Sequence, residues 1–324
     1  MNIIETSELT KKFNGFTAVD NLNLQIKEGE LFGLLGPNGA GKSTTIYMLT
    51  TLLEPTGGSA SVNGFDVQKQ AQRVRESMGI VFQDHTLDNR LSAYDNLDIH
   101  GRLYSIPSPE RQKRIREVMA LVNLEDWTDK LVRTYSGGMK RRLEIARGLM
   151  QKPKLLFLDE PTLGLDPQTR RHIWHYIEKL RTEGVSIVLT THYLEEADYL
   201  CDRVAIMDHG KIVALDTPAN LKGMLEGNVI KIGCSKPKKL MSLLLKNKLA
   251  SKPKIMDGIL KFSAHEISKA VPRIMKLAEK ANISVNSIET HEPSLEEVFI
   301  HYTGRSIREE KGSAMDEMRR FRAH

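Results

Sequence analysis

The spacing of apolar residues divides the first 220 positions into strand-like and helix-like stretches. Four short, mainly apolar runs are typical of strands buried on both faces: Leu31–Leu35, Met78–Phe82, Leu155–Leu158 and Ser186–Thr190. Ahead of them, residues 3–9 read as a strand, and Leu22, Leu24 and Ile26 alternate with polar residues, as in a strand with one wet face. Asn14-Gly15 between these two is a strong turn signal, so we expect an antiparallel pair.

Helical spacing takes over elsewhere. Helices are expected at Thr45–Leu49, at Ala71–Ser77 and from Pro167 through Lys179. In residues 86–152 the strand signals vanish, and helical spacing links Ile115, Val118, Met119 and Val122. Pro107 and Pro109 are expected to break these helices. One later helix face is shared by Met139, Leu143, Ala146 and Met150, with basic residues on the other faces. We therefore expect a helical insertion between two strands.

Beyond residue 220 the pattern changes to a strand–helix–strand order repeated twice. The predicted strands are Asn228–Ile232, Lys254–Met256, Ile259–Ser263 and Ile283–Ile288, and the predicted helices are Pro237–Lys248 and His265–Lys280. The order βαββαβ predicts a small ferredoxin-like α+β domain. We expect a large domain at 1–220, whose helical part spans about 86–152, a small regulatory or accessory domain at 221–304, and a mobile, charged tail at 305–324.

Composition limits where the protein works. The chain of 324 residues has no apolar run near the eighteen or so residues that cross a bilayer, and its charged start gives no sign of a signal peptide. The two cysteines, Cys201 and Cys234, fit a reducing cytoplasm. Residues 221–324 carry 20 Lys and Arg against 12 Asp and Glu, whereas residues 1–220 carry 27 against 29. This basic excess suits an anionic membrane surface or nucleic acid, but a solvated lysine-rich face is the commoner explanation.

The clearest chemical motif follows the first buried run. It reads Gly36, Pro37, Asn38, Gly39, Ala40, Gly41, Lys42, Ser43, Thr44. A strand, this GxxxxGK[ST] loop and a helix form a phosphate-binding P-loop, in which glycines let backbone N–H groups turn toward phosphate oxygens. Lys42 supplies a positive charge to the β- and γ-phosphates, and Ser43 offers a hydroxyl to Mg²⁺. The motif and its context predict nucleotide binding.

Polar residues follow the other buried runs. Asp159 and Glu160 end one run; Asp159 suits Mg²⁺ ligation, and Glu160 suits polarising the water that attacks the γ-phosphate. Gln83 and His192 follow two more runs. Alone, each would more often be a surface or satisfied polar residue. Parallel strands, however, bring their carboxyl ends to one edge, where Gln83 can ligate Mg²⁺ or orient the water as a catalytic residue, and His192 can contact the γ-phosphate.

Two further features fit a nucleotide site. Ser136 is a suitable N-cap for the helix that Gly137 and Gly138 begin, and the two glycines let a phosphate approach that helix end. A capped helix with no ligand would also explain this stretch on its own. Phe13 at the first turn could stack on an adenine, although a lone Phe is usually part of a core.

Taken together, residues 3–220 resemble the ATP-binding subunit of ABC transporters. The P-loop resembles the family's Walker A motif, Gln83 its Q-loop, and Ser136-Gly137-Gly138-Met139 its signature loop. Leu155–Asp159 resembles Walker B, with Glu160 as the catalytic base; Leu165-Asp166 resembles the D-loop, and His192 the switch histidine. The motifs stand in the family's order. The signature begins with Tyr135 and the D-loop reads Leu163-Gly164-Leu165-Asp166, and both departures resemble daunorubicin-resistance exporter ATPases.

The resemblance implies a P-loop NTPase cassette: a mainly parallel sheet core, an antiparallel β subdomain and a helical subdomain. It implies a cytoplasmic ATPase that needs ATP and Mg²⁺ and pairs with a second ATPase subunit on the inner face of the cell membrane. This pair would drive a separate membrane-spanning permease, which would export a drug, lipid or other amphiphile. In such a pair Ser136 and Gly138 would cap the γ-phosphate held by the partner subunit. Gly137 and Asp166 are also expected to bind ATP, and Phe13 would stand where the family stacks its adenine.

Other functions stay open at this point. An ABC ATPase acting on DNA usually carries a long coiled coil between Walker A and the signature, whereas this chain has only a short helical stretch there. One acting on ribosomes usually carries two cassettes, whereas this chain has one. We therefore expect no nucleic-acid partner. An importer ATPase would carry a different C-terminal domain. A non-hydrolysing scaffold is disfavoured because Glu160 and His192 are both present, and GTP because the chain has no Asn-Lys-x-Asp motif.

Overall fold

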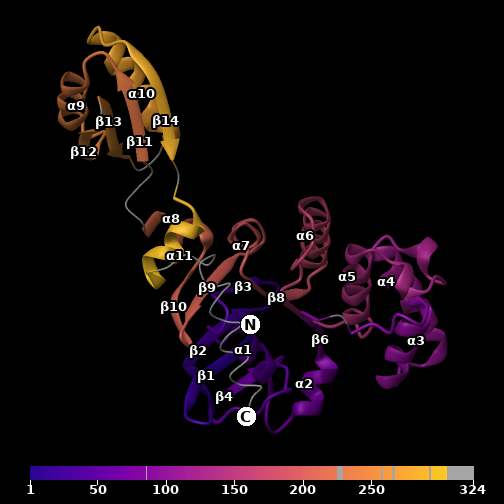
Figure 1. Ribbon diagram of the computed structural model, residues 1–324. Coiled ribbons are helices and arrows are strands. Elements are labelled where there is room, and N and C mark those ends of the chain that lie inside the picture. The colour runs from indigo at the N-terminus through magenta and orange to yellow at the C-terminus, as the bar shows by residue number, and fades with distance from the viewer. Residues whose placement is uncertain (85, 225–228, 257, 265–266, 292, 305–324) are drawn as a thin grey trace. The chain divides into compact units, whose positions relative to one another are not determined.

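The computed structural model describes residues 1–304 except 85, 225–228, 257, 265–266 and 292. The described residues divide into two compact units, Met1–Pro218 and Ala219–Gly304 (Figure 1). The expected tail at 305–324 lies outside the described residues. So do Asn228 and His265, the first residues of one predicted strand and one predicted helix.

The first unit begins with an antiparallel sheet in the order β2-β1-β4-β5. Its strands are β1 (Asn2–Phe13), β2 (Phe16–Lys27), β4 (Gly57–Val62) and β5 (Phe65–Asp66). The predicted hairpin is confirmed: Phe13 pairs with Phe16, and Asn14 and Gly15 both have positive φ angles, 39° and 87°. This is the backbone that a two-residue hairpin loop requires. The strand predicted at 3–9 continues to Phe13 through shifts in register.

The second sheet of this unit has the order β10-β9-β3-β8-β7-β6. Its strands are β3 (Leu31–Leu35), β6 (Met78–Val81), β7 (Leu155–Asp159), β8 (Ser186–Thr191), β9 (Arg203–Asp208) and β10 (Lys211–Asp216). Neighbours from β9 to β6 pair in parallel, and β10 adds to the edge antiparallel. The predicted mainly parallel sheet is confirmed. Every residue of β3, β7 and β8 is buried, as their apolar runs indicate.

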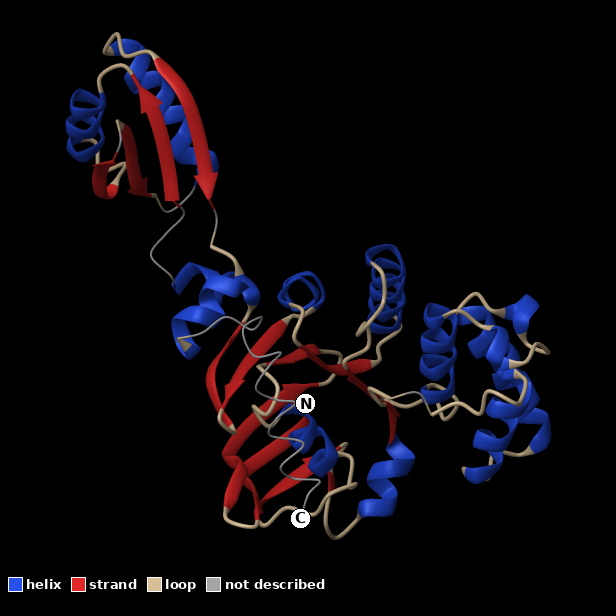
Figure 2. Ribbon diagram, viewed as in Figure 1, coloured by secondary structure: helices blue, strands red, loops and turns tan. Residues whose placement is uncertain are grey.

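Helices cover both faces of the six-stranded sheet. They are α1 (Lys42–Leu49), α2 (Ala71–Ser77), α6 (Pro167–Thr182) and α7 (Leu194–Leu200). In the view of Figure 2, α6 and α7 lie above this sheet and α1 lies below it. The helix α1 contacts β2 and β4 of one sheet and β7 of the other, so its Ile46 and Leu49 join the two sheets in one core. This packing fixes the first turn of α1 beside the strand ends.

The helical insertion is also confirmed. It contains α3 (Ala93–Leu103), α4 (Ser108–Leu121), α5 (Gly137–Gly148) and the 3₁₀ turns η1 (Glu125–Trp127) and η2 (Val132–Thr134). The helices are interrupted where expected: α3 ends at Leu103, Pro107 is the N-cap of α4, and Pro109 stands in its first turn, where a missing N–H costs nothing. In α5 the basic Arg141 and the acidic Glu144 are both buried. Within the described residues, no helix is both long and apolar enough to cross a membrane.

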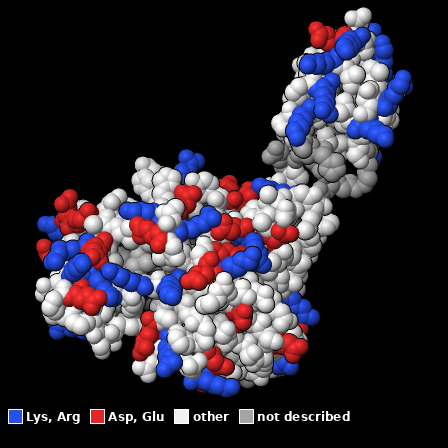
Figure 3. All heavy atoms as spheres, turned by 180° about the vertical axis from the view of Figure 1, so that it is seen from behind, with Lys and Arg blue, Asp and Glu red and all other residues white. Residues whose placement is uncertain are grey.

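The second unit has the predicted βαββαβ order. Its elements are β11 (Val229–Cys234), α9 (Pro237–Lys246), β12 (Ser251–Met256), β13 (Ile259–Ser263), α10 (Ile267–Lys280) and β14 (Val285–His291), flanked by α8 (Pro218–Met224) and α11 (Leu295–Thr303). The antiparallel sheet has the order β12-β13-β11-β14, which is ferredoxin-like. Ile230 and Phe262 face Leu244 and Ile274 in the core, and Lys231 and Lys261 lie exposed. Figure 3 shows Lys and Arg side chains gathered on this unit.

Candidate nucleotide-binding and hydrolysis site

The P-loop leaves the first turn of α1 open to an anion. Gly41 at the N-cap has no side chain to bond the N–H groups of that turn, and its φ of 102° suits glycine alone. A Cβ at Gly41 would lie 2.5 Å from the carbonyl oxygen of Ala18. The sequence thus places bare amides at the positive end of a helix dipole, which is an arrangement that binds phosphate.

Lys42 is held inside this loop. Its Nζ donates to the carbonyl oxygens of Gly36 (2.7 Å) and Pro37 (3.0 Å), and the residue is 6% exposed. The ammonium group therefore already lies among the loop's polar atoms. A phosphate group in the loop would give it a full negative charge to pair with in place of neutral carbonyls.

The carboxylate of Asp159 lies at the carboxyl end of β7, beside Ser43. Its Oδ1 accepts from the hydroxyl of Thr190 (2.5 Å) and from that of Ser43 (3.4 Å). Its Oδ2 is buried and has no hydrogen-bond partner among the described residues. Burial, reinforced by the nearby charge of Glu160, raises the pKa of Asp159. An orphaned carboxylate oxygen next to a hydroxyl is a donor set that fits Mg²⁺.

Glu160 has an unusual backbone and a partner from the next strand. Its φ of 49° lies in the left-handed region, where a residue with a Cβ is strained. Its N–H donates to the hydroxyl oxygen (3.0 Å) and to the carbonyl oxygen (3.2 Å) of Thr190, which hold this conformation. Its Oε2 lies 2.5 Å from Nδ1 of His192, whose ring contacts Tyr193. The structure therefore brings the two predicted catalytic side chains into direct contact.

The signature loop lies elsewhere in the unit, against the start of α6. Ser136 caps α5, and its hydroxyl oxygen accepts from the N–H of Met139 (3.3 Å). A Cβ at Gly138 would lie 2.3 Å from Cγ2 of Thr169, and Asp166 caps α6 by accepting from Thr169 through backbone and hydroxyl. Figure 1 shows α5 and α1 in different parts of the unit. The loop and the P-loop therefore do not share one pocket within this chain.

Two other predicted site residues are exposed. Gln83 is exposed in a bend that follows β6. Phe13 is 40% exposed at the tip of the β1–β2 hairpin, with the ammonium of Lys11 5.1 Å from the centre of its ring. The structure brings together Lys42, Ser43, Asp159, Glu160 and His192. The signature loop and Asp166 lie elsewhere in the unit, Phe13 lies at the hairpin tip, and Gln83 follows the end of β6.

The sequence analysis missed several residues at this site. Thr190 bonds both acidic residues, yet a threonine near the end of an apolar run gives no signal of that role. Arg141 and Glu144 are 3% and 1% exposed, and neither was assigned a buried position from the sequence. An oppositely charged pair three positions apart, beside the apolar face of the helix, is the signal that could have found them.

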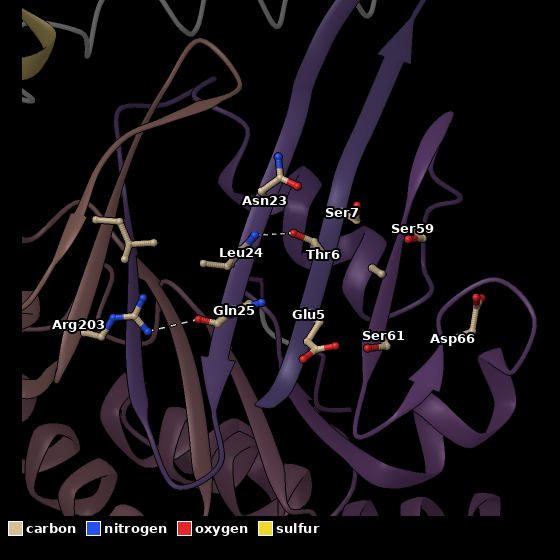
Figure 4. A pocket seen from close by; sticks show the side chains of 12 residues that line it. Glu5, Thr6, Ser7, Asn23, Leu24, Gln25, Ser59, Ser61, Asp66 and Arg203 are labelled. Carbon is tan, nitrogen blue, oxygen red and sulfur yellow. Dashed lines mark hydrogen bonds between the residues drawn. The ribbon is translucent and has the colours of Figure 1, made fainter. Parts of the chain in front are cut away.

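A separate hollow of 630 Å³ lies over the antiparallel sheet of the first unit. It is lined by polar side chains of β1, β2 and β4, among them Glu5, Ser7 and Asn23, as Figure 4 shows. Of its lining, Arg203 donates to the carbonyl of Gln25 (3.3 Å). Among the described residues, its lining includes no predicted site residue, so it is distinct from the site at the strand ends.

Family models match both units of the chain. A model described as "ABC transporter" matches residues 19–163, and one described as "ATP-binding protein DrrA1-3-like, C-terminal domain" matches residues 217–303. A model of an AAA domain matches residues 131–198.

Curated proteins match over nearly their whole length. The daunorubicin/doxorubicin resistance ATP-binding protein DrrA of Streptomyces peucetius is 40% identical, with 93% of this chain and 92% of that protein covered. The linearmycin resistance ATP-binding protein LnrL of Bacillus subtilis (strain 168) is 35% identical, with 95% and 100% covered. The Nod factor export ATP-binding protein I of Cupriavidus metallidurans is 36% identical, with 95% and 99% covered.

Solved structures match about two thirds to three quarters of the chain. The dimeric structure of a post-hydrolysis state of the ATP-binding cassette MJ0796, bound to ADP and Pi, is 28% identical with a TM-score of 0.60, covering 66% of this chain and 98% of that one. The structure of cbiO1 from Clostridium perfringens, part of the ABC transporter complex cbiONQ, is 29% identical with a TM-score of 0.64, covering 76% and 95%. The fold of the matched region is therefore that of an ATP-binding cassette.

Proposed function

The chain belongs to the ABC transporter family of ATP-binding proteins, and on that premise we propose that two copies form a Mg²⁺-dependent ATPase at the inner face of the cell membrane. Family membership makes it an ATPase that powers a membrane exporter. The pairing of two copies, the roles of single residues and the place in the cell are parts of the proposal.

One observation carries the residue assignments. The carboxyl ends of β3, β7 and β8 lie at one edge of the sheet, so that Ser43 meets Asp159 and Glu160 meets His192. A nucleotide-binding loop, an orphaned carboxylate oxygen and a carboxylate–imidazole pair in one place are the groups that phosphoryl transfer to water requires.

Each residue then has a chemical task. The amides of the loop Gly36–Thr44 and the ammonium of Lys42 bind phosphate oxygens. Ser43, Asp159 and Gln83 hold the metal. Bound MgATP supplies the reactive γ-phosphate and a cation that neutralises its charge. Glu160 accepts a proton from the attacking water, and His192 holds the Glu160 side chain and stabilises charge on the γ-phosphate.

The remaining predicted residues serve a shared site. Because the signature loop lies against α6 rather than at its own P-loop, Ser136, Gly137 and Gly138 are free to meet the nucleotide of a second copy. Asp166, as the cap of α6, positions that loop through Thr169. A dimeric cassette among the similar structures supports this arrangement.

The cargo proposal rests on the names of relatives. These are named for resistance to daunorubicin, doxorubicin and linearmycin and for export of Nod factor. We propose that this chain drives export of a small amphiphile through a separate membrane-spanning chain, and that the second unit regulates that pairing. The assignment of cargo is by analogy.

Glu160→Gln tests the hydrolysis mechanism. The amide keeps the shape of the side chain but cannot accept a proton, so we expect turnover to fall about a hundredfold or more. Affinity for ATP should stay close to that of the wild type, and a closed dimer should accumulate with ATP in size-exclusion chromatography. Glu183→Gln, exposed at the end of α6, is the matched control. Near-normal turnover in Glu160→Gln would remove this residue from the mechanism.

A further inference from the structure

The guanidinium group of Arg141 in α5 binds three consecutive carbonyls at the end of β7. Its Nε donates to Pro161 (2.8 Å), and its Nη2 donates to Asp159 (2.9 Å) and Glu160 (3.1 Å). Its Nη1 donates to the carbonyl of Phe82, just before Gln83, at 2.5 Å. The side chain thus connects α5, whose first turn carries the signature loop, to the backbone of both acidic residues.

The fifth donor position of Arg141 faces Glu144. Nη1 of Arg141 lies 3.1 Å from Oε2 of Glu144, so all five N–H groups of the guanidinium have an acceptor. Glu144 in turn accepts from the N–H of Thr86 (3.0 Å), and Arg147 donates to the carbonyl of Thr86 (3.0 Å). Successive turns of α5 therefore hold both ends of the segment from Phe82 to Thr86, which contains Gln83.

Stability alone does not account for this arrangement. Taking a guanidinium and a carboxylate out of water is costly, and well-packed apolar residues often replace such a buried pair without loss of stability. What apolar residues or a lysine cannot reproduce is the planar fork that reaches carbonyls of separate segments at once. Four of the five acceptors are backbone carbonyls of the predicted Q-loop and Walker B segments.

We propose that Arg141 is a positioning residue for ATP hydrolysis: it fixes the peptides of Asp159, Glu160 and Pro161 relative to α5 and to the end of β6. In this role Arg141 keeps Glu160 in its left-handed conformation, facing His192. Because the catalytic carboxylate must be held closely in place, a loosened backbone lowers the rate of the chemical step more than nucleotide binding. The inference rests on the proposed role of Glu160.

The test compares Arg141→Lys with Arg142→Lys in the full chain. Arg142 is the next residue of the same helix, and its Nη1 donates to the carbonyl of Val122 (2.9 Å) and approaches Tyr176, on α4 and α6. Both variants keep the positive charge and lose the fork, but the hydrogen bonds of Arg142 do not involve the strand ends. Any difference between the two variants therefore reports on the contacts to residues 159–161 and 82.

Steady-state ATPase kinetics provide the readout. In Arg141→Lys we expect kcat to fall about tenfold to a hundredfold, while the KM for ATP changes less than about threefold. In Arg142→Lys we expect both constants within about threefold of the wild type. A folded Arg141→Lys whose kcat equals that of Arg142→Lys, or whose loss lies in KM alone, would overturn the proposal.

A second pair of variants separates positioning from folding. Arg141→Met removes the guanidinium that Oε2 of Glu144 contacts, and the double variant Arg141→Met/Glu144→Leu removes the buried carboxylate as well. We expect the double variant to recover thermal stability but not kcat. Recovery of kcat along with Tm would show that Arg141 is structural and would overturn the proposal.

The two proposals fail in different ways. If Glu160→Gln hydrolyses ATP normally, the proposed mechanism is wrong, and the Arg141 role that rests on it is wrong as well. If Glu160→Gln is inactive and Arg141→Lys is fully active, only the positioning role of Arg141 is refuted.

Discussion

At the scale of single residues, burial changes the pKa of a carboxyl group near the strand ends. Glu196 in α7 is fully buried, and its Oε1 accepts from the hydroxyl of Thr162 and from Nε1 of Trp174, both at 2.9 Å. Burial raises the pKa of Glu196, against hydrogen bonds that lower it. The carboxyl group thus connects the turn after Glu160 to α6 through two hydrogen bonds, while burial removes the water that would solvate its ionised form.

The raised pKa of Glu196 predicts how stability depends on pH. Because the folded-state pKa lies above the unfolded-state value, its stabilising contribution is complete below the ordinary pKa of glutamic acid and is lost as pH rises through the folded-state pKa. Glu196→Gln keeps the shape and the acceptor oxygen but has no charge. Between pH 5 and pH 8 we expect the unfolding free energy of the wild type to fall more steeply than that of Glu196→Gln. The two slopes should differ by up to about 1.4 kcal/mol per pH unit.

Chemical denaturation at several pH values in this range, followed by circular dichroism, measures this difference. Glu195→Gln is the control, because Glu195 is the preceding residue of the same helix and is exposed. Asp159, whose pKa is also raised, is present in every variant and cancels in the comparison. An identical pH dependence in the wild type and Glu196→Gln would show that Glu196 does not set it.

At the scale of elements, the hairpin β1–β2 presents an aromatic ring at its tip. Phe13→Ala should raise the KM for ATP about fivefold if the ring stacks on adenine, because a stacking contact contributes about 1 kcal/mol. Phe13→Tyr should be nearly neutral, since the ring remains. Phe16→Ala is the control, because Phe16 pairs with Phe13 across the turn and is also exposed. Equal KM values in Phe13→Ala and the wild type would leave Phe13 without a role in binding.

Elements were predictable from sequence where one local rule dominates. The run Leu31–Leu35 became a fully buried strand, Asn14-Gly15 became a turn with two positive φ angles, and Ala71–Ser77 became a helix with those bounds. Pro107 and Pro109 mark the break between α3 and α4 as expected, but sequence alone does not say that they begin the second helix rather than end the first.

The site was only partly predictable, for a different reason. Loop chemistry and carboxylates at strand ends have sequence signals, so Lys42, Ser43, Asp159, Glu160 and His192 were all predicted to meet. Thr190 and Arg141 act through contacts with backbone groups of segments distant in the chain. Such contacts depend on tertiary packing, which the local pattern does not encode.

At the scale of the whole molecule, a shared site predicts complementation between two damaged chains. Lys42→Ala removes the phosphate lysine, and Gly137→Asp places a carboxylate at the loop proposed to meet the partner's γ-phosphate. Gly137 is preferable to Gly138, because the nearest atom to its added Cβ is Cδ2 of Leu165 at 3.9 Å, whereas Gly138 has no room. A mixed dimer contains one intact site, so we expect ATPase activity to return on mixing.

If a dimer needs both of its sites intact to hydrolyse ATP, mixing the two variants restores no activity, and crosslinking then tests the shared site. Cysteines placed at Gly39 and Ser136 should form an ATP-dependent dimer band if the loops meet across chains; the native Cys201 is buried. A chain with the Gly39 cysteine alone is the control. Absence of both recovered activity and crosslinks would refute the shared site.

The separation of the site residues along the chain has a consequence for biosynthesis. Ser43 and Asp159, which share a hydrogen bond, are 116 positions apart, and β3 pairs with β8. Parallel pairing over such separations closes long loops, which slows folding. A growing chain therefore carries its P-loop long before the acidic residues exist, and we expect nucleotide to stabilise the unit only after translation has passed β8. From then on, bound ATP at a concentration c stabilises the folded unit by RT ln(1 + c/Kd), so each further tenfold excess over Kd adds about 1.4 kcal/mol.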